Sequence, residues 1–266
     1  MRGRVLIVAG SDSGGGAGIQ ADIKAVTMLD GFAMTAITAL TAQNTQGVFG
    51  ILPIAPEFIR QQMTVVLDDI GADAIKTGML HDIPVIETVA AALAERAAAI
   101  PLVVDPVMVA KGGAALIEPS AIDALKTQLV ARATVLTPNL PEAEILSGRA
   151  IDSVDGMKLA AEALLGLGCR AVLLKGGHLP GATVTDVLAT AAGFRVWDSK
   201  RIDSRHTHGT GCTLASAIAV GLAQGLAVEA AVERARDYVL RAIASAPGFG
   251  HGHGPLDHAH PLHRRH

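Results

Sequence analysis

The run His208-Gly209-Thr210-Gly211-Cys212 has the residue types of an anion-binding helix start. Its two glycines let the backbone approach a ligand closely, and the apolar segment that follows is typical of a buried helix. The first turn of such a helix has unpaired N–H groups and a positive dipole end, which suit a phosphate or a developing oxyanion. Since the same dipole lowers the pKa of a thiol, we expect Cys212 to exchange a proton near neutral pH. Two other interpretations of Cys212 are a covalent nucleophile with His208 as its base, and a small buried thiol.

Three short apolar runs each end in a polar residue, which is Asp105, Asn139 or Lys175. Because the carboxyl ends of parallel strands share one sheet edge, where ligands bind, we expect these side chains to converge. Glu142 would lie one turn into the helix after Asn139. Two carboxylates and an amide suit Mg²⁺ and its waters, and a lysine suits phosphate oxygens. Each residue alone could merely end a strand or cap a helix, but their combination with a glycine-rich anion site favours a functional site.

A glycine-rich loop, Gly10-Ser-Asp-Ser-Gly-Gly-Gly-Ala-Gly18, follows the first apolar run. It has neither the Lys-Ser/Thr pair of a P-loop nor the G-x-G-x-x-G spacing of a dinucleotide-binding turn. The loop could be a simple turn or a ligand-binding segment. Asp22 and Gln43 lie nearby and could hydrogen-bond a polar heterocycle, although such residues are also common as capping or solvated side chains.

The elements that must position these residues alternate between short buried strands and longer Ala-rich helices. This alternation predicts right-handed βαβ units and a mostly parallel sheet covered on both faces, in a single domain. Within 183–205 the rhythm breaks, and two short runs around Gly193 predict an antiparallel hairpin at one sheet edge. The other predicted strands are Val5–Ala9, Met34–Leu40, Ala74–Thr77, Leu102–Asp105, Thr134–Thr137 and Ala171–Lys175. The predicted helices are 17–29, 56–69, 83–99, 119–131, 153–167, 211–224 and 227–245.

Composition excludes several classes of protein. Of 266 residues 50% are hydrophobic and 18% charged, which is enough for a large core and excludes wholesale disorder. The net charge of −3 gives no broad basic face for nucleic acid. The two cysteines, Cys169 and Cys212, are too few for a disulfide framework. The chain opens on a strand-like run rather than a signal peptide, and no uninterrupted apolar segment suits a membrane span, so we expect a cytoplasmic protein.

Histidines are concentrated in the C-terminal segment 250–266, which has six of the ten in the chain. Such a density raises the possibility of a metal site, since imidazole binds Zn²⁺ or Ni²⁺. The spacing matches no closed zinc motif and no cysteine is near. We therefore expect a loose polar tail, formed by residues that include His251, His253, His258, His260, His263 and His266.

Taken in order, the motifs resemble the hydroxymethylpyrimidine/phosphomethylpyrimidine kinases of thiamine biosynthesis, members of the ribokinase-like superfamily. The resemblance covers nearly the whole chain, including its His-rich end. Gly14 and Gly112 depart from it, since the family often has Ser at both positions. The motifs are GSDSGGGAGIQADIK (10–24), TALTAQNTQGV (38–48), KTGML (76–80), DPVMVAKGG (105–113), TPNLPEAEIL (137–146), KGGH (175–178) and HGTGCTLASAIA (208–219).

The resemblance implies a three-layer α/β/α fold and phosphoryl transfer from ATP to a hydroxymethyl group, and then to the resulting monophosphate. It implies that Cys212 takes the hydroxyl proton. It also implies that Lys175 and Asn139 lie against the ATP phosphates. The remaining implied roles are an anion hole from Gly209, Thr210 and Gly211, an aminopyrimidine pocket from Gln43, Asp22, Gly10 and Met79, and Mg²⁺ binding by Asp105 and Glu142.

Two other functions remain open from the sequence. A pyridoxal or pyridoxine kinase of the same superfamily would also use a hydroxymethyl heterocycle, although Gln43 favours the pyrimidine. A non-catalytic protein that binds a metal or ligand through the His-rich tail is the alternative from another class. The edge hairpin and the low charge content make us expect a homodimer, with no nucleic acid or membrane partner.

Overall fold

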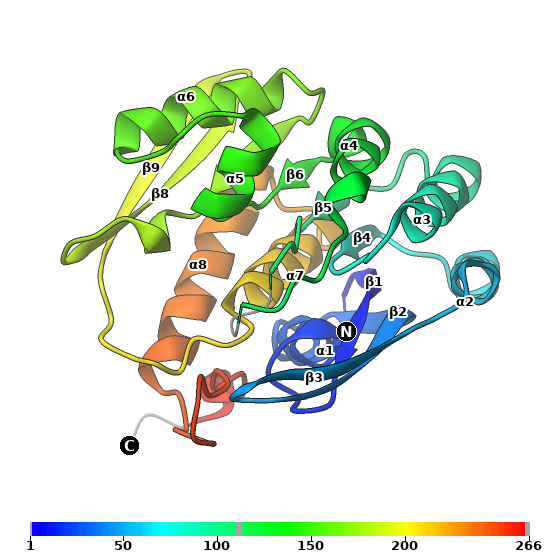
Figure 1. The fold of residues 1–266 in the computed structure, drawn as a ribbon, viewed down its shortest axis with the longest axis horizontal. Coiled ribbons are helices and arrows are strands. Elements are labelled where there is room, and N and C mark those ends of the chain that lie inside the picture. The colour runs from blue at the N-terminus through cyan, green and yellow to red at the C-terminus, as the bar shows by residue number, and fades with distance from the viewer. Residues whose placement is uncertain (1, 110–112, 264–266) are drawn as a thin grey trace.

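The computed structural model describes residues 2–109 and 113–263, and all nine strands within these ranges form one sheet (Figure 1). Its order is β3-β2-β1-β4-β5-β6-β7-β8-β9. The six strands from β2 to β7 in this order are parallel, whereas β3, β8 and β9 are antiparallel to their neighbours. The strands are β1 (Arg4–Asp12), β2 (Phe32–Asn44), β3 (Gly47–Pro53), β4 (Ala74–Thr77), β5 (Leu102–Val104), β6 (Val135–Leu136), β7 (Ala171–Leu174), β8 (Thr183–Thr190) and β9 (Gly193–Lys200).

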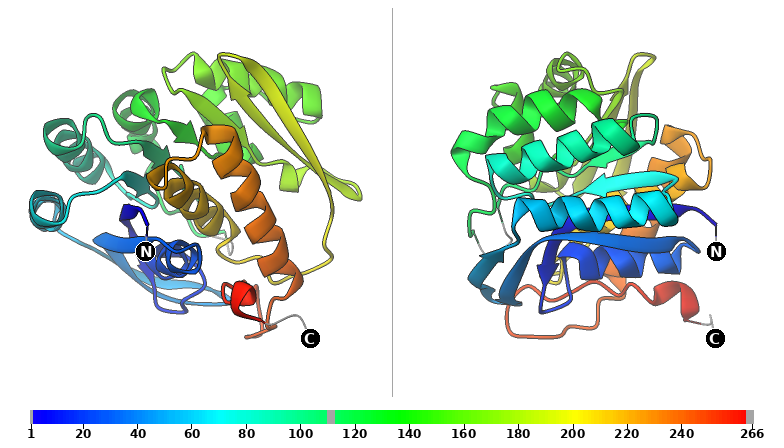
Figure 2. Two further views of the ribbon diagram at one scale, coloured as in Figure 1. Left: turned by 180° about the vertical axis from the view of Figure 1, so that it is seen from behind. Right: turned by 90° about the vertical axis from the view of Figure 1, so that its right-hand side faces the viewer.

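Helices cover both faces of the sheet, as the views from behind and from the side show (Figure 2). On one face α2 to α6 pack against the larger apolar core, and on the other α1, α7 and α8 pack against a second core. The helices are α1 (Gly18–Met28), α2 (Pro56–Asp69), α3 (Ile83–Arg96), α4 (Ile122–Ala124), α5 (Leu140–Ser147), α6 (Val154–Leu165), α7 (Thr210–Ala223) and α8 (Val228–Ala244). This arrangement confirms the expected three-layer α/β/α fold.

The central strand β1 shows why the sheet is buried on both faces. Its successive side chains point to opposite faces, as the pleat requires. Val5 and Ile7 belong to the core under α1, α7 and α8, whereas Leu6 and Val8 belong to the core under α2 to α6. All four are fully buried, so the continuous apolar run predicts a strand with helices on both sides.

Two elements differ from the sequence-based expectation. Strand β3 was not predicted; it pairs antiparallel with the far end of β2 and extends that strand to Asn44, beyond the predicted end at Leu40. The predicted helix 119–131 is a helical stretch over Pro119–Arg132 that changes from 3₁₀ to α to π geometry and back to 3₁₀. The extension of β2 carries Gln43, one of the residues expected at the site. None of the helices described has the length and apolar character needed to cross a membrane.

Candidate active site

Helix α7 is preceded by a glycine that no other residue could replace without strain. Gly209 precedes the helix with φ +81°, in the left-handed region, and a Cβ there would lie 1.8 Å from the backbone oxygen of Gly16. The start of α7 therefore touches the glycine-rich loop after β1. No described side chain caps this helix start. The Thr210 N–H donates to the Thr207 backbone oxygen (3.3 Å), so the N–H groups of Gly211 and Cys212 are the ones offered to a ligand. Thr210 Oγ1 donates to the backbone oxygen of Thr207 (2.7 Å) and fixes the turn before the helix.

Two strand ends bring opposite charges to this helix start. Lys175, directly after β7, lies with its Nζ 3.4 Å from Asp105 Oδ1, directly after β5. Thr137, after β6, donates its hydroxyl to the same Asp105 oxygen at 3.2 Å. A Cβ on Gly211 would lie 3.3 Å from Lys175 Nζ and 3.6 Å from Asp105 Oδ2, so glycine leaves this side of the helix open to both groups. The structure thus brings Asp105, Lys175 and the start of α7 together, as the strand ends predict.

Asn139 and Glu142 form a capping box at the start of α5. The Asn139 side chain accepts from the Glu142 N–H (3.0 Å), and Glu142 Oε2 accepts from the Asn139 N–H (2.8 Å). Burial raises the pKa of Glu142 to about 7; Lys175 opposes this shift and the Asp105 charge adds to it. The capping function that the sequence left open is present, and it fixes both side chains beside Asp105 and Lys175.

The carboxyl pair Asp105 and Glu142 fits a divalent cation. Both groups are buried, and burial raises the pKa of Glu142, so a bound cation would stabilise its charged form. Mg²⁺ commonly uses one or two carboxylates together with waters and phosphate oxygens. The remaining lone pairs of these two carboxylates are therefore suitable ligands.

The expected low pKa of Cys212 is wrong. Burial raises the pKa of this thiol to about 12; Lys76 opposes the shift, and the carboxylates Asp22 and Asp105 add to it. The N–H of Gly18 also stabilises the thiolate, but less strongly. Loss of hydration and two nearby negative charges outweigh the helix dipole, which acts only over the first turn.

Asp22 lies in a fully buried ion pair with Lys76 instead of on an open surface. Lys76 Nζ lies 2.9 Å from Asp22 Oδ2, and Ser216 Oγ donates to Asp22 Oδ1 at 2.7 Å. Burial lowers the pKa of Lys76, but Asp22, Cys212 and Asp105 outweigh it and raise the value, so Lys76 is charged. Sequence reasoning missed Lys76, although a lysine inside a four-residue buried strand is an unusual signal.

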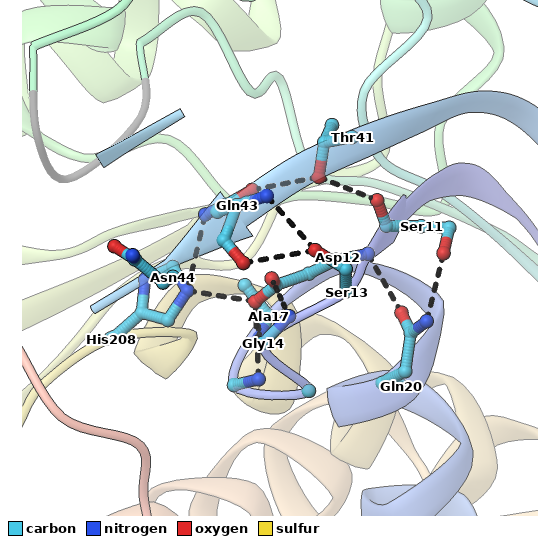
Figure 3. A network of polar contacts seen from close by, with 12 residues as sticks. Ser11, Asp12, Ser13, Gly14, Ala17, Gln20, Thr41, Gln43, Asn44 and His208 are labelled. Atoms are coloured by element: carbon cyan, nitrogen blue, oxygen red, sulfur yellow. Dashed lines mark hydrogen bonds and ion pairs between the residues drawn. The ribbon is translucent and has the colours of Figure 1, made fainter. Parts of the chain in front are cut away.

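Gln43, at the end of β2, belongs to a polar network (Figure 3). Its Nε2 lies 3.3 Å from His208 Nε2, and its Oε1 lies 3.1 Å from Thr41 Oγ1. His208 Nε2 in turn lies 2.9 Å from Asp12 Oδ2. The network joins the end of β2, the end of β1 and the residue before Gly209.

Asp12 organises the glycine-rich loop. Its carboxylate accepts from the N–H groups of Gly14 (2.8 Å), Gly16 (3.1 Å) and Ala17 (2.8 Å). Burial raises its pKa, but the His208 ring and these N–H groups outweigh burial and hold the pKa below its usual value. Sequence reasoning missed Asp12, although an acidic residue inside a run of glycines is a signal for a loop held by backbone N–H groups.

Gly10 and Met79 lie in contact near this network. A Cβ on Gly10 would lie 3.1 Å from Met79 Sδ, and Thr38 Oγ1 donates to the Met79 backbone oxygen at 2.7 Å. Gly14 is also tight, with a would-be Cβ 3.2 Å from Asp12 Oδ1. Gly112 lies outside the described residues.

The predicted loose tail is wrong: the segment 250–262, here called the C-terminal strap, packs across the site. Gly252 and His253 donate their N–H groups to Thr45, in the turn after β2. The His208 N–H donates to the Gly254 oxygen (3.2 Å), and His258 Nε2 lies 2.9 Å from Thr213 Oγ1 of α7. Glycines that suggested irregular structure permit this contact, since a Cβ on Gly252 would lie 2.1 Å from the Thr45 oxygen. Within the described ranges no cluster of three or more His, Cys, Asp or Glu could hold a metal.

Comparison with known proteins assigns this arrangement to a family. The family model described as phosphomethylpyrimidine kinase matches residues 12–257. The hydroxymethylpyrimidine/phosphomethylpyrimidine kinase of Bacillus subtilis is 47% identical over 256 residues, covering 96% of this chain and 94% of that protein. The thiamine biosynthesis bifunctional protein ThiED of Geobacter sulfurreducens is 52% identical over 97% of this chain, which spans about half (52%) of that protein's length.

A solved structure has the same fold. The ADP complex of Bacillus subtilis pyridoxal kinase superposes with a TM-score of 0.90 and 38% identity, covering 97% of this chain and 98% of that one. Its identity is lower than that of the two pyrimidine-pathway relatives. The chain therefore belongs to the phosphomethylpyrimidine kinase family, and it is a phosphotransferase of the hydroxymethylpyrimidine/phosphomethylpyrimidine kinase type.

Proposed function

We propose that this chain transfers the γ-phosphoryl group of ATP to 4-amino-5-hydroxymethyl-2-methylpyrimidine, and then phosphorylates the monophosphate to the diphosphate for thiamine biosynthesis. The observation that carries this proposal is the position of Lys175 and Asp105 beside Gly211 in the first turn of α7. Phosphoryl transfer needs positioning and neutralisation of charge more than covalent chemistry. A lysine, free N–H groups and a buried carboxylate pair supply these together.

Each group at the strand ends would act on the phosphates. Lys175 binds phosphate oxygens, and the backbone at Gly209, Thr210 and Gly211 receives the transferred phosphoryl group. Asn139 lies beside the triphosphate, where its capping bond holds it in place. When bound, Mg²⁺ neutralises phosphate charge; the residues that would hold it are Asp105 and Glu142.

Cys212 would accept the substrate proton. The hydroxyl oxygen of the substrate forms a bond to the γ-phosphorus, the bond from that phosphorus to the β–γ bridging oxygen breaks, and ADP leaves. The hydroxyl proton passes to the thiolate of Cys212. A pKa of about 12 makes the thiolate scarce at neutral pH but a strong base.

The pyrimidine would lie against Gln43, with Gly10 and Met79 forming the wall of the pocket. Asp22 has no exposed surface, so we assign it to the floor of this pocket, where it holds the charge of Lys76 below Cys212.

A substrate comparison tests the proposed function, because a pyridoxal kinase shares the fold. ADP release is measured with hydroxymethylpyrimidine, its monophosphate and pyridoxal as separate acceptors. We expect the first two to be phosphorylated with a higher kcat/KM than pyridoxal. A higher kcat/KM for pyridoxal contradicts the proposal. Lys175→Ala should lose activity. Replacement of the half-buried Lys158, whose partner is Asp155 on the same helix, by Ala should not.

We further propose that the chain is one domain and forms a homodimer through its β3 edge. Phe49 and Leu52 on this strand are 72% and 62% exposed, and Leu40 on β2 is exposed beside them. Exposed apolar side chains on an edge strand favour pairing with another chain.

A further inference from the structure

The side-chain amide of Gln43 can be placed in two orientations, and in one of them the protons of the surrounding network cannot satisfy all of its short contacts. Thr41 Oγ1 lies 2.8 Å from the Ser11 backbone oxygen as well as 3.1 Å from the Gln43 amide. His208 Nε2 lies 2.9 Å from Asp12 Oδ2 as well as 3.3 Å from the other end of that amide (Figure 3). A hydroxyl has one proton and a ring nitrogen has at most one.

The fixed acceptors decide where these two protons point. The Ser11 carbonyl can only accept, so the Thr41 proton points to it and Thr41 Oγ1 offers Gln43 a lone pair. The Asp12 carboxylate also only accepts, so His208 carries its proton on Nε2, and this N–H faces both Asp12 and Gln43.

Only one orientation of the amide satisfies every contact. The –NH₂ of Gln43 must face the Thr41 lone pair, and its oxygen must face the His208 N–H. The opposite orientation, drawn in Figure 3 with Gln43 Nε2 towards His208 and Oε1 towards Thr41, sets two acceptors against each other at Thr41 and two N–H donors against each other at His208. The nitrogen and oxygen of an amide have nearly the same shape, so their positions follow from the hydrogen-bond inventory.

We propose that His208, held by Asp12, and Thr41 are positioning residues that fix the Gln43 amide in this one orientation and thereby select the ring that binds. The inference rests on the proposed function for the identity of that ring. The fixed amide has one free lone pair on its His208 side and one free N–H on its Thr41 side. An aminopyrimidine offers an amino donor beside a ring-nitrogen acceptor, which complements this order.

The surrounding structure resists rotation of the amide. Asp12 is held by three N–H groups of its loop and is only 2% exposed. The His208 ring lies against Gly16, where a Cβ would be 2.5 Å from ring atom Cδ2. Thr41 and His208 are both buried. The amide is therefore held at both ends by groups that cannot reorient freely.

The test uses a ligand pair with opposite hydrogen-bonding edges. In the 4-oxo analogue of hydroxymethylpyrimidine, the carbonyl accepts where the amino group donates, and the neighbouring ring N–H donates. Calorimetric titration of the wild-type protein should give a Kd at least about 100-fold lower for the amino compound, as a site built on paired hydrogen bonds discriminates strongly. His208→Phe and Thr41→Val should reduce this ratio at least tenfold, because the amide can then rotate.

Conservative variants separate an effect on the orientation of the Gln43 amide from a general loss of structure in the binding site. His208→Gln keeps an N–H near the Nε2 position and Thr41→Ser keeps the hydroxyl, so both should retain the ratio within about threefold. A purely structural role would weaken both ligands equally and leave the ratio unchanged in all variants. That result, or equal wild-type affinity for the two analogues, overturns the inference. Phosphorylation of the amino compound by the same wild-type protein tests the proposed function separately.

Discussion

The environment of Cys212 shows how burial competes with a helix dipole at a single residue. The run that contains this thiol predicts a low pKa from its place at a helix start, yet the structure gives a pKa of about 12. The sequence could not reveal this, because the burial of the thiol, and the smaller effects of the Asp22 and Asp105 charges, arise from segments that are distant in the chain. The protonation of a candidate base depends on groups that only the fold brings near.

The pH dependence of turnover should show the high pKa of Cys212. Below that pKa the thiolate fraction rises tenfold for each pH unit, so kcat should rise with pH between about 8.5 and 9.5, where Glu142 is almost fully ionised. Steady-state assays with saturating substrates measure this slope. Cys212→Ala should lower kcat by about 10²-fold or more and remove the slope. Cys169→Ala is the matched control and should keep both; a flat wild-type profile argues against the base.

Gly209 combines a positive φ with a close backbone contact, and a comparison with Gly225 separates the effects of these two features on stability. Gly209→Ala adds a Cβ 1.8 Å from the Gly16 oxygen at a positive φ, so it should lower the free energy of unfolding by about 2 kcal/mol or more and reduce activity. Gly225 has φ +84° and no described atom within 4 Å of a Cβ, so Gly225→Ala should lose about 1 kcal/mol and keep activity. Urea unfolding measures both; equal losses would contradict the packing argument.

Among the elements, the buried ones and the edge hairpin of β8 and β9 could be predicted, whereas β3 and the C-terminal strap could not. Continuous apolar runs predict the parallel strands and most helices because these elements are buried on the sheet. Strand β3 contains two glycines and ends in proline, and most of its side chains are exposed, so it has no clear period. The C-terminal strap was missed because glycine signals irregular structure locally but also permits close backbone contact with a distant turn.

The strap is the element whose removal should matter most. A chain ending at Gly248 loses the contacts to Thr45, His208 and Thr213, so its melting temperature should fall by several degrees and kcat/KM should fall at least about tenfold. Calorimetry measures the melting temperature, and the assay of ADP release measures kcat/KM. Gly252→Ala should show a milder form of both, whereas Gly47→Ala, with no described atom within 4 Å of its Cβ, is the control. Full activity after truncation would restore the loose-tail prediction.

At the scale of the whole molecule, the exposed β3 edge leads to a prediction about assembly. Sedimentation at about 10 μM protein should give a dimer, and Leu52→Asp should give a monomer because it places a charge in the proposed contact. Leu159→Asp, on the exposed surface of α6, is the matched control and should remain dimeric. A monomeric wild-type protein would exclude this contact.

The mostly parallel sheet and the convergence of its strand ends were predictable because connections in α/β sheets follow few rules, but the strand order was not predicted. The network of Asp12, His208 and Gln43 was not, since its members lie up to 196 positions apart. Pairing of this length is set by the complete sheet and helices, and no local pattern encodes it. Of the candidate site, the sequence thus predicts the phosphate side better than the ring side.

The C-terminal strap also has a consequence for folding during synthesis of the chain. It ties the turn at Thr45 and the residue His208 to a segment beyond residue 249, and such distant contacts form late. On the ribosome, the N-terminal strands can pair while the end of the chain is still being made. We therefore expect the pocket to be complete only after residues 250–262 have left the ribosome, so a nascent chain that lacks them should not yet consume ATP.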